Sequence, residues 1–166
     1  MPFVESTWNR SDLLKSHQGK DFENFLKNIE NEVKEIENVR SLLDSYPPEE
    51  IVLLLKKIES VETKCSVLQC YAYLWFSEDT KSQEARAFQD KMKQFSASIG
   101  NRIIFFNLWF KSLEENSAKK IISNSGKYRY YFEKILLEKP YTLSEKEEKI
   151  LQLKETTGSS AFCTLY

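Results

Sequence analysis

Apolar residues recur every three or four positions along most of the first 115 residues, which is the spacing of one face of an α-helix. Between residues 21 and 43 the apolar positions follow this spacing, while Lys and Glu occupy many of the others. The pattern predicts an amphipathic helix over residues 21–43 that packs one stripe against a partner. Tyr46-Pro47-Pro48 is expected to end it, because the residue before a proline is disfavoured in helical geometry.

The next two periodic segments predict a long helical hairpin. Residues 48–76 keep the spacing throughout and would span roughly 43 Å as one helix. Residues 77–80 are expected to form the turn, with Thr80 and Gln83 as a capping box for a third helix. Gly100 lies in the middle of that third helix and is the expected position of a kink or break. Residues 48–115 are therefore predicted to form an antiparallel pair.

The segment Ile103–Phe110 is apolar on almost every side. A run this short is compatible with a buried helix or with a β-strand. The helical spacing on either side of it favours a helix that neighbours cover on more than one face.

Shorter elements are expected beyond residue 115. The sequence indicates a brief helix over residues 117–122, a turn over residues 123–126 and a helix that carries apolar positions from Tyr128 to Leu136. Ser144 and Glu147 form a capping-box pattern, and Leu143 stands where a hydrophobic staple would begin. The predicted fold class is all-α, a single region 1–166 with long helices over 1–115 and shorter ones over 116–166.

A new apolar run begins at Ala161, and the sequence stops within it. Chain termini usually lie in polar, frayed segments. We therefore expect the 166 residues to be an N-terminal fragment of a longer chain.

Composition and charge narrow the class of protein. Four glycines and four prolines among 166 residues argue against a sandwich or barrel, which needs frequent turns. A net charge of −1 gives no global field to attract nucleic acid, and no apolar stretch approaches the length of a membrane span. The N-terminus does not resemble a secretory signal. We expect a cytoplasmic protein without nucleic-acid or membrane partners, whose Cys65, Cys70 and Cys163 are buried, reduced thiols.

The sequence nominates no catalytic, cofactor-binding or metal-binding residue. His17 is the single histidine and lies in a polar stretch, so it is predicted to be a solvated surface residue. No two glycines are close enough for a phosphate-binding loop. Residues 127–131 alternate basic and aromatic side chains as single-strand nucleic-acid grooves do, but Tyr128 and Tyr131 share an apolar helix face, which favours a core role. This chain alone is not expected to be an enzyme.

Several segments, in order, resemble the N-terminal region of oligoendopeptidase F-type zinc metallopeptidases, relatives of thimet oligopeptidase. Residues 8–13, WNRSDL, resemble an opening W-x-L-S-D-L, although Asn9-Arg10 departs from the Asp-Leu that the family prefers. The sharper match is the tyrosine-rich segment 128–133 followed by residues 140–151, PYTLSEKEEKIL, which resembles P-x-T-L-S-E-x-E-E-x-I-L. Residues 157–161 and 165–166 continue like the family's T-G-x-x-A and L-[FY].

The resemblance implies a largely helical fold around a narrow channel that admits oligopeptides. In the family, an HExxH helix and a later glutamate hold zinc, and the HExxH glutamate activates water. None of these residues has a counterpart here, so the resemblance carries over no site residue. It implies a helical scaffold region that forms part of the channel wall, with zinc and catalysis supplied by a missing C-terminal domain.

The alternative is a free-standing helical module that binds a partner protein without catalysis. Under the fragment hypothesis, part of the apolar surface lacks its intramolecular cover, which predicts a homodimer. The residues expected in that contact are Trp109, Phe110, Phe162 and Tyr166.

Overall fold

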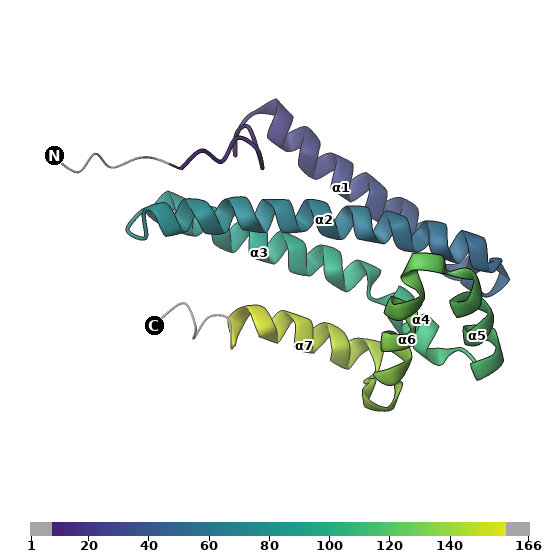
Figure 1. Ribbon diagram of the computed structural model, residues 1–166. Helices are drawn as coiled ribbons and strands as arrows, with labels where there is room; N and C mark the ends of the chain where they lie inside the picture. The colour runs from purple at the N-terminus through teal and green to yellow at the C-terminus, as the bar shows by residue number, and fades with distance from the viewer. Residues whose placement is uncertain (1–7, 159–166) are drawn as a thin grey trace, which may run out of the picture.

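The computed structural model describes residues 8–158 of the chain, apart from the side chains of residues 155–157. Every regular element in this range is helical, and no strand occurs in it, which confirms the all-α prediction (Figure 1). The α-helices are α1 Lys20–Asn38, α2 Pro48–Glu78, α3 Gln83–Ile103, α4 Phe105–Ser112, α5 Glu115–Asn124, α6 Arg129–Leu137 and α7 Glu145–Thr157. Short 3₁₀ helices cover η1 Arg40–Ser45, η2 Gly126–Tyr128 and η3 Lys139–Tyr141.

The α2–α3 hairpin is the centre of the fold. The two helices run side by side over most of their length, as predicted, and α1 packs across both (Figure 1). The predicted pair over residues 48–115 is too long, because α3 ends at Ile103 and the chain continues as the separate helix α4, which packs against α6. The turn differs from the predicted capping box, because Ser82 is the N-cap of α3 and its hydroxyl accepts a hydrogen bond from the Ala85 N–H at 3.2 Å. Thr80 with Gln83 has the capping-box spacing, whereas Ser82 is followed three positions later by Ala85, so the sequence pattern points to the wrong cap.

The first helix is shorter than its apolar spacing predicts. It ends at Asn38, and the chain continues as the 3₁₀ helix η1 instead of reaching residue 43 as α-helix. The apolar stripe nevertheless stays continuous, because Leu43 in η1 is buried in the same core as Ile29, Val33 and Ile36 of α1. The 3₁₀ turn thus extends the packed face while changing the direction of the backbone.

Gly100 does not break α3, contrary to the sequence-based expectation. The helix continues to Ile103, and the chain turns only at Ile104, before α4. A Cβ atom at position 100 would lie 2.2 Å from Nε2 of Gln152. The space at Gly100 is filled by the amide end of the Gln152 side chain, so this residue contributes to the contact between α3 and α7.

The segment Ile103–Phe110 is helical, which decides against the strand alternative. Phe105, Phe106 and Phe110 are buried, and neighbours cover them from several sides. Phe132 of α6 contacts this cluster, and the centroid of its ring lies 4.6 Å from the centroid of the Phe110 ring. Helices α4, α5 and α6 thereby form a compact end of the molecule beside the hairpin (Figure 1).

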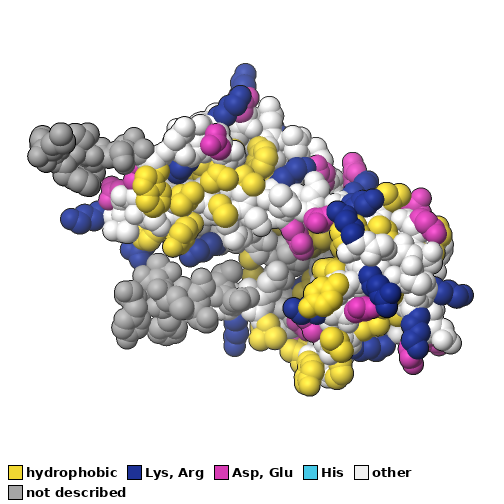
Figure 2. Space-filling model, viewed as in Figure 1, with side chains coloured by type: hydrophobic (Ala, Val, Ile, Leu, Met, Phe, Trp, Pro, Cys, Tyr) yellow, Lys and Arg dark blue, Asp and Glu magenta, His cyan; other side chains and the backbone are white. Residues whose placement is uncertain are grey.

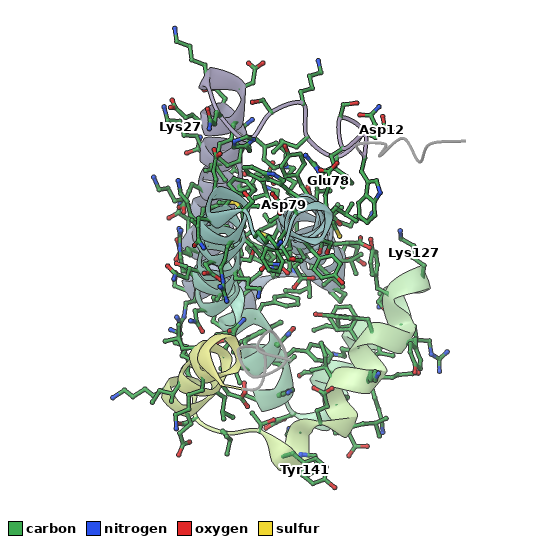
Figure 3. The ribbon with its side chains drawn as sticks, turned by 90° about the vertical axis from the view of Figure 1, so that its left-hand side faces the viewer. Asp12, Lys27, Glu78, Asp79, Lys127 and Tyr141 are labelled. Carbon is green, nitrogen blue, oxygen red and sulfur yellow. The ribbon has the colours of Figure 1, made fainter. Side chains whose placement is uncertain are left out.

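Helix α7 lies along α3 and packs mainly against it (Figures 1 and 3). Its start agrees with the prediction: Ser144 and Glu147 form the complete capping box. The predicted staple is wrong, because the residue one turn into the helix is Glu148, whose carboxylate accepts the Leu143 N–H at 3.1 Å. Ile150, Leu151 and Leu153 are about half exposed, at 54 %, 50 % and 52 %. Figure 2 shows further apolar side chains at the surface near α6 and the connection to α7.

Candidate functional site

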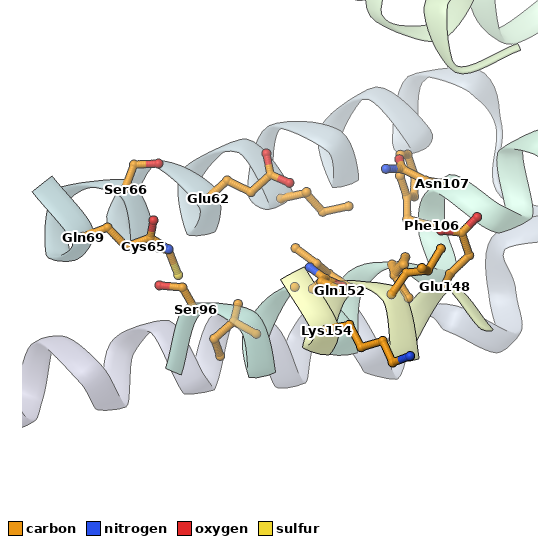
Figure 4. A pocket seen from close by; sticks show the side chains of 16 residues that line it. Glu62, Cys65, Ser66, Gln69, Ser96, Phe106, Asn107, Glu148, Gln152 and Lys154 are labelled. Atoms are coloured by element: carbon orange, nitrogen blue, oxygen red, sulfur yellow. The ribbon is translucent and has the colours of Figure 1, made fainter. Parts of the chain in front are cut away.

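A groove of about 890 Å³ lies between α2 and α7, above α3 and the start of α4 (Figure 4). Its size is within the range of ligand-binding pockets. The residues that line it come from three separate parts of the sequence: Ile58, Glu62, Cys65, Ser66, Gln69; Ser96, Ile99, Gly100, Ile103, Ile104, Phe106, Asn107; Glu148, Leu151, Gln152, Lys154. The tertiary packing of α7 against α3 is what brings them together.

One face of α2 forms the first side of the groove. Its lining residues are spaced by four, three, one and three positions, so they lie on a single helical face. Ile58 and Cys65 are buried, and between them lies the carboxylate of Glu62. A charged residue one turn from buried neighbours on the same face is the signal in the sequence that could have identified this site.

The carboxylate of Glu62 points into the groove (Figure 4). The residue as a whole is exposed, but the loss of water around its carboxylate, followed by the negative charge of Glu59, raises its pKa. Glu59 accepts a hydrogen bond from the Tyr128 hydroxyl at 2.6 Å. Within residues 8–158 no Lys, Arg or His forms an ion pair with Glu62. This end of the groove is therefore acidic and has no counter-charge among the described side chains.

Tyr131 and Asn107 lie beside this acidic end. The Tyr131 hydroxyl donates to Oδ1 of Asn107 at 3.0 Å. Burial, followed by the charge of Glu62, raises the pKa of Tyr131 to about 12, so the phenol is protonated at neutral pH. The hydrogen bond occupies the carbonyl oxygen of Asn107 and leaves its amide nitrogen as a donor at the groove.

A buried polar atom without a hydrogen-bond partner faces the same space. Oε1 of Gln152 is enclosed and has no such partner among the described residues. The side chain of Cys65 lies next to Ser96 (Figure 4); burial raises the pKa of its thiol, and a hydrogen bond with Ser96 opposes this. An enclosed acceptor without a donor costs free energy, so Gln152 favours a ligand that brings N–H or O–H groups.

A second hollow, of about 670 Å³, lies on the other side of α7 and differs in chemistry. Its basic side chains are already paired: Arg102 contacts Glu37 through Nε and Nη2 at 2.9 and 2.6 Å, and contacts Glu30 at 2.6 Å. Arg40 holds both oxygens of Glu145 at 3.2 and 2.6 Å. These bonds link α1, η1, α3 and α7, so the charged residues around this hollow hold the helices together.

The structure corrects the prediction for His17. Its side chain is only 25 % exposed and packs against aromatic rings, with the Trp75 centroid 4.2 Å away. Phe88 and Tyr71 complete the cluster, and the carboxylate of Glu84 lies 3.4 Å from Nε2. The polar sequence around His17 concealed this, because its apolar partners come from α2 and α3 and lie more than fifty positions away.

The remaining predicted residues have mixed outcomes. Cys65 is buried as expected, but Cys70 is exposed, and Cys163 lies outside the described residues. Tyr128 and Tyr131 pack against the core, which confirms the structural interpretation of residues 127–131.

The expected dimer contact needs correction at its described positions. Phe110 is fully buried, so it offers no surface for a second copy. Trp109 is half-buried, and its Nε1 donates to Asp44 at 2.7 Å. Phe162 and Tyr166 lie outside the described residues.

Among the side chains that the structure describes, no three of His, Cys, Asp or Glu are placed to hold a metal ion. The helices of residues 8–158 include none with the length and apolar character required to cross a bilayer.

Comparison with known proteins gives one consistent result. Residues 109–166 match the model of a family described as Oligopeptidase F. The chain is 26 % identical over 150 residues to "Oligoendopeptidase F, plasmid" of Lactococcus lactis subsp. cremoris, and equally to "Oligoendopeptidase F homolog" of Lactococcus lactis subsp. lactis (strain IL1403). Each alignment covers 87 % of this chain but 24 % of the relative, so the chain spans about a quarter of their length. No solved structure gives a significant match.

Proposed function

We propose that this chain, which resembles the N-terminal region of oligoendopeptidase F, is the helical scaffold of a zinc-dependent oligopeptidase and forms part of its substrate-channel wall. The similarity extends over most of the chain, and the family match covers its last third. The observation that carries the proposal is the groove of about 890 Å³ between α2 and α7, which is lined by both apolar and amide side chains.

The residues of this chain would bind and orient a peptide and would not carry out the chemistry. Amide side chains such as Gln69, Asn107 and Gln152 can exchange hydrogen bonds with a peptide backbone, while Ile104 and Leu151 offer apolar contacts. Zinc, when bound by another part of the peptidase, would supply the activated water. The described residues offer no place for that ion. The proposed location of the peptidase is the cytoplasm.

The alternative function, a helical module that binds a partner protein, has one observation in its favour. Helix α7 leaves Ile150 and Leu151 half exposed, as a helix that docks onto another protein would. The scaffold proposal accounts for the same exposure as surface covered by the rest of the peptidase.

An antibody raised against α2–α3 distinguishes these functions in the organism of origin. The scaffold proposal expects immunoprecipitation of a polypeptide several-fold larger than 19.6 kDa that cleaves a fluorogenic oligopeptide and loses this activity with 1,10-phenanthroline. Recovery of a 19.6-kDa polypeptide alone, without peptidase activity, would overturn the proposal and favour the interaction module.

The 166-residue chain by itself is expected to bind no stoichiometric zinc and to cleave no peptide at neutral pH, because His17 is its single histidine. Metal analysis after dialysis checks this, with His17→Ala as the matched variant. About one tightly held zinc per chain, lost in that variant, would contradict the expectation.

A further inference from the structure

We propose that the groove between α2 and α7 binds an extended peptide segment and places a lysine or arginine side chain of that peptide against Glu62. The inference rests on the proposed function and adds the class of side chain that this part of the channel prefers.

The charges on the two sides of α7 argue for a cationic ligand at Glu62. On the far side, Arg102 and Arg40 already have carboxylate partners of this chain. In the groove, Glu62 lies near a second carboxylate, that of Glu59, and no described cation forms an ion pair with it. A positively charged side chain would remove this repulsion and form a charge-assisted hydrogen bond in a partly desolvated place.

The other charged residues that line the groove, Glu148 and Lys154, lie on α7 and do not neutralise Glu62. Glu148 is engaged with the Leu143 N–H at the start of α7. Lys154 is six positions after Glu148 on α7, and its side chain is directed away from Glu62 (Figure 4).

A buried polar atom that lacks a partner argues for a polypeptide backbone and against a small cation alone. Oε1 of Gln152 is an enclosed acceptor on α7, on the side of the groove opposite α2 (Figure 4). An extended backbone brings N–H groups at regular intervals and can satisfy such an acceptor. Its successive side chains point to opposite sides, so one can reach Glu62 while its neighbours contact the apolar side chains of Ile104 and Leu151.

Binding is measured by NMR titration of the ¹⁵N-labelled 166-residue chain. The probes are three capped heptapeptides, Ala-Ser-Ala-Xaa-Ala-Ser-Ala, in which Xaa is lysine, norleucine or glutamate. Norleucine has nearly the length of lysine without its charge. We expect the lysine peptide to perturb backbone signals of the groove residues and to bind about two- to fivefold more tightly than the norleucine peptide, as one partly exposed ion pair would produce. The glutamate peptide should bind most weakly.

Three variants identify the residue responsible. Glu62→Gln keeps the shape of the side chain and should abolish the preference for lysine over norleucine. Asp90→Asn makes the same change of charge at an exposed position of α3 that lines none of the described pockets, so the preference should remain. Ser66→Arg adds a guanidinium four residues after Glu62 on the same face of α2, where it should pair with Glu62 and block the lysine peptide. Circular dichroism of each variant controls for folding.

The outcomes separate this inference from the proposed function. Equal binding of lysine and norleucine peptides in the groove would overturn the role of Glu62 and leave the channel-wall proposal standing. Perturbation of the groove by an amphipathic helical peptide, with none by the heptapeptides, would overturn the inference in favour of helix docking. If no peptide binds, the inference fails, and the immunoprecipitation experiment decides the proposed function independently.

Discussion

Arg102 shows how one side chain stabilises contacts between distant parts of this fold. Its guanidinium lies on α3 and bonds two carboxylates of α1, Glu37 through two nitrogens and Glu30 through a third. A planar fork of donors suits this geometry, which a lysine could not reproduce. The hydrogen bond from Arg102 lowers the pKa of Glu37, so the pair is intact at neutral pH.

Replacing Arg102 should therefore destabilise the chain in a pH-dependent way. Arg102→Met is expected to reduce the free energy of unfolding at pH 7 by about 1 kcal/mol, because the pairs are partly exposed and screened. Since the pKa of Glu37 lies below the unfolded value of 4.5, its contribution is present above that pH and is lost as the pH falls through the folded pKa. Urea denaturation at pH 7 and pH 3.5 should show a smaller difference between variant and parent at the lower pH. An equal difference at both would contradict the ion-pair explanation.

Gly100 and Gln152 form a second residue-scale test. Alanine in a helix interior is favoured over glycine by about 1 kcal/mol, but a Cβ at position 100 meets the amide end of Gln152. Gly100→Ala should therefore change the unfolding free energy little in the parent chain, because the gain in propensity is offset by displacement of Gln152. In a Gln152→Ala background the same substitution should stabilise by about 0.5–1 kcal/mol. Equal effects in both backgrounds, measured by a double-mutant cycle, would show that the two residues do not interact.

At the scale of elements, α7 packs mainly against a single helix, α3. The amide end of Gln152, which lies against Gly100, and the ion pair of Glu145 with Arg40 of η1 connect α7 to the rest of the fold. Helices with few buried contacts open more readily than the core. The groove is therefore bounded by one well-packed helix, α2, and one more loosely attached helix, α7.

The capping box should control how often α7 opens. Ser144→Ala removes the hydroxyl that accepts the Glu147 N–H and should cost about 1 kcal/mol of local stability. Hydrogen exchange should become faster in α7 by several-fold, while amides of α2 and α3 keep their protection. Ser60→Ala, at an exposed position within α2, is the matched control. Uniform acceleration across the molecule would show instead that α7 opens only with global unfolding.

At the scale of the whole molecule, the described residues form a hairpin with α1 packed across it, an aromatic cluster at one end and α7 beside α3 (Figures 1 and 3). The exposed apolar side chains gather on the later elements. Tyr130, Leu137 and Tyr141 of α6 and η3 are 72 %, 75 % and 83 % exposed, and three residues of α7 are half exposed. This distribution places available apolar surface on the part of the chain that matches the Oligopeptidase F family.

Self-association remains a prediction, with a different surface from the one expected from sequence. Because Phe110 is buried, α7 is the better candidate, and Ile150→Lys should weaken association without disturbing the core. Light scattering at about 100 µM is expected to show a dimer for the parent chain and a shift toward monomer for the variant. Lys57→Ala, at an exposed position of α2, serves as the control. A monomeric parent that binds no hydrophobic dye would contradict the prediction.

The sequence alone determined the class of fold and most of its elements. The helical spacing of apolar residues predicted the α2–α3 hairpin, and the local pattern of Ser144 and Glu147 predicted the start of α7. These features depend on interactions within a few residues, which is why a linear pattern contains them. Motifs in the last forty residues identified the resemblance that the family match confirms.

Only the tertiary structure decided which side chains meet. It placed His17 among the aromatic rings of α2 and α3, gave Gly100 a role in packing and brought Glu62, Ser96 and Gln152 to one groove. Glu62 and Gln152 are ninety positions apart, and no local pattern relates them. Burial and loss of solvent depend on helices packing together, so the sequence could predict the helices but not the site between them.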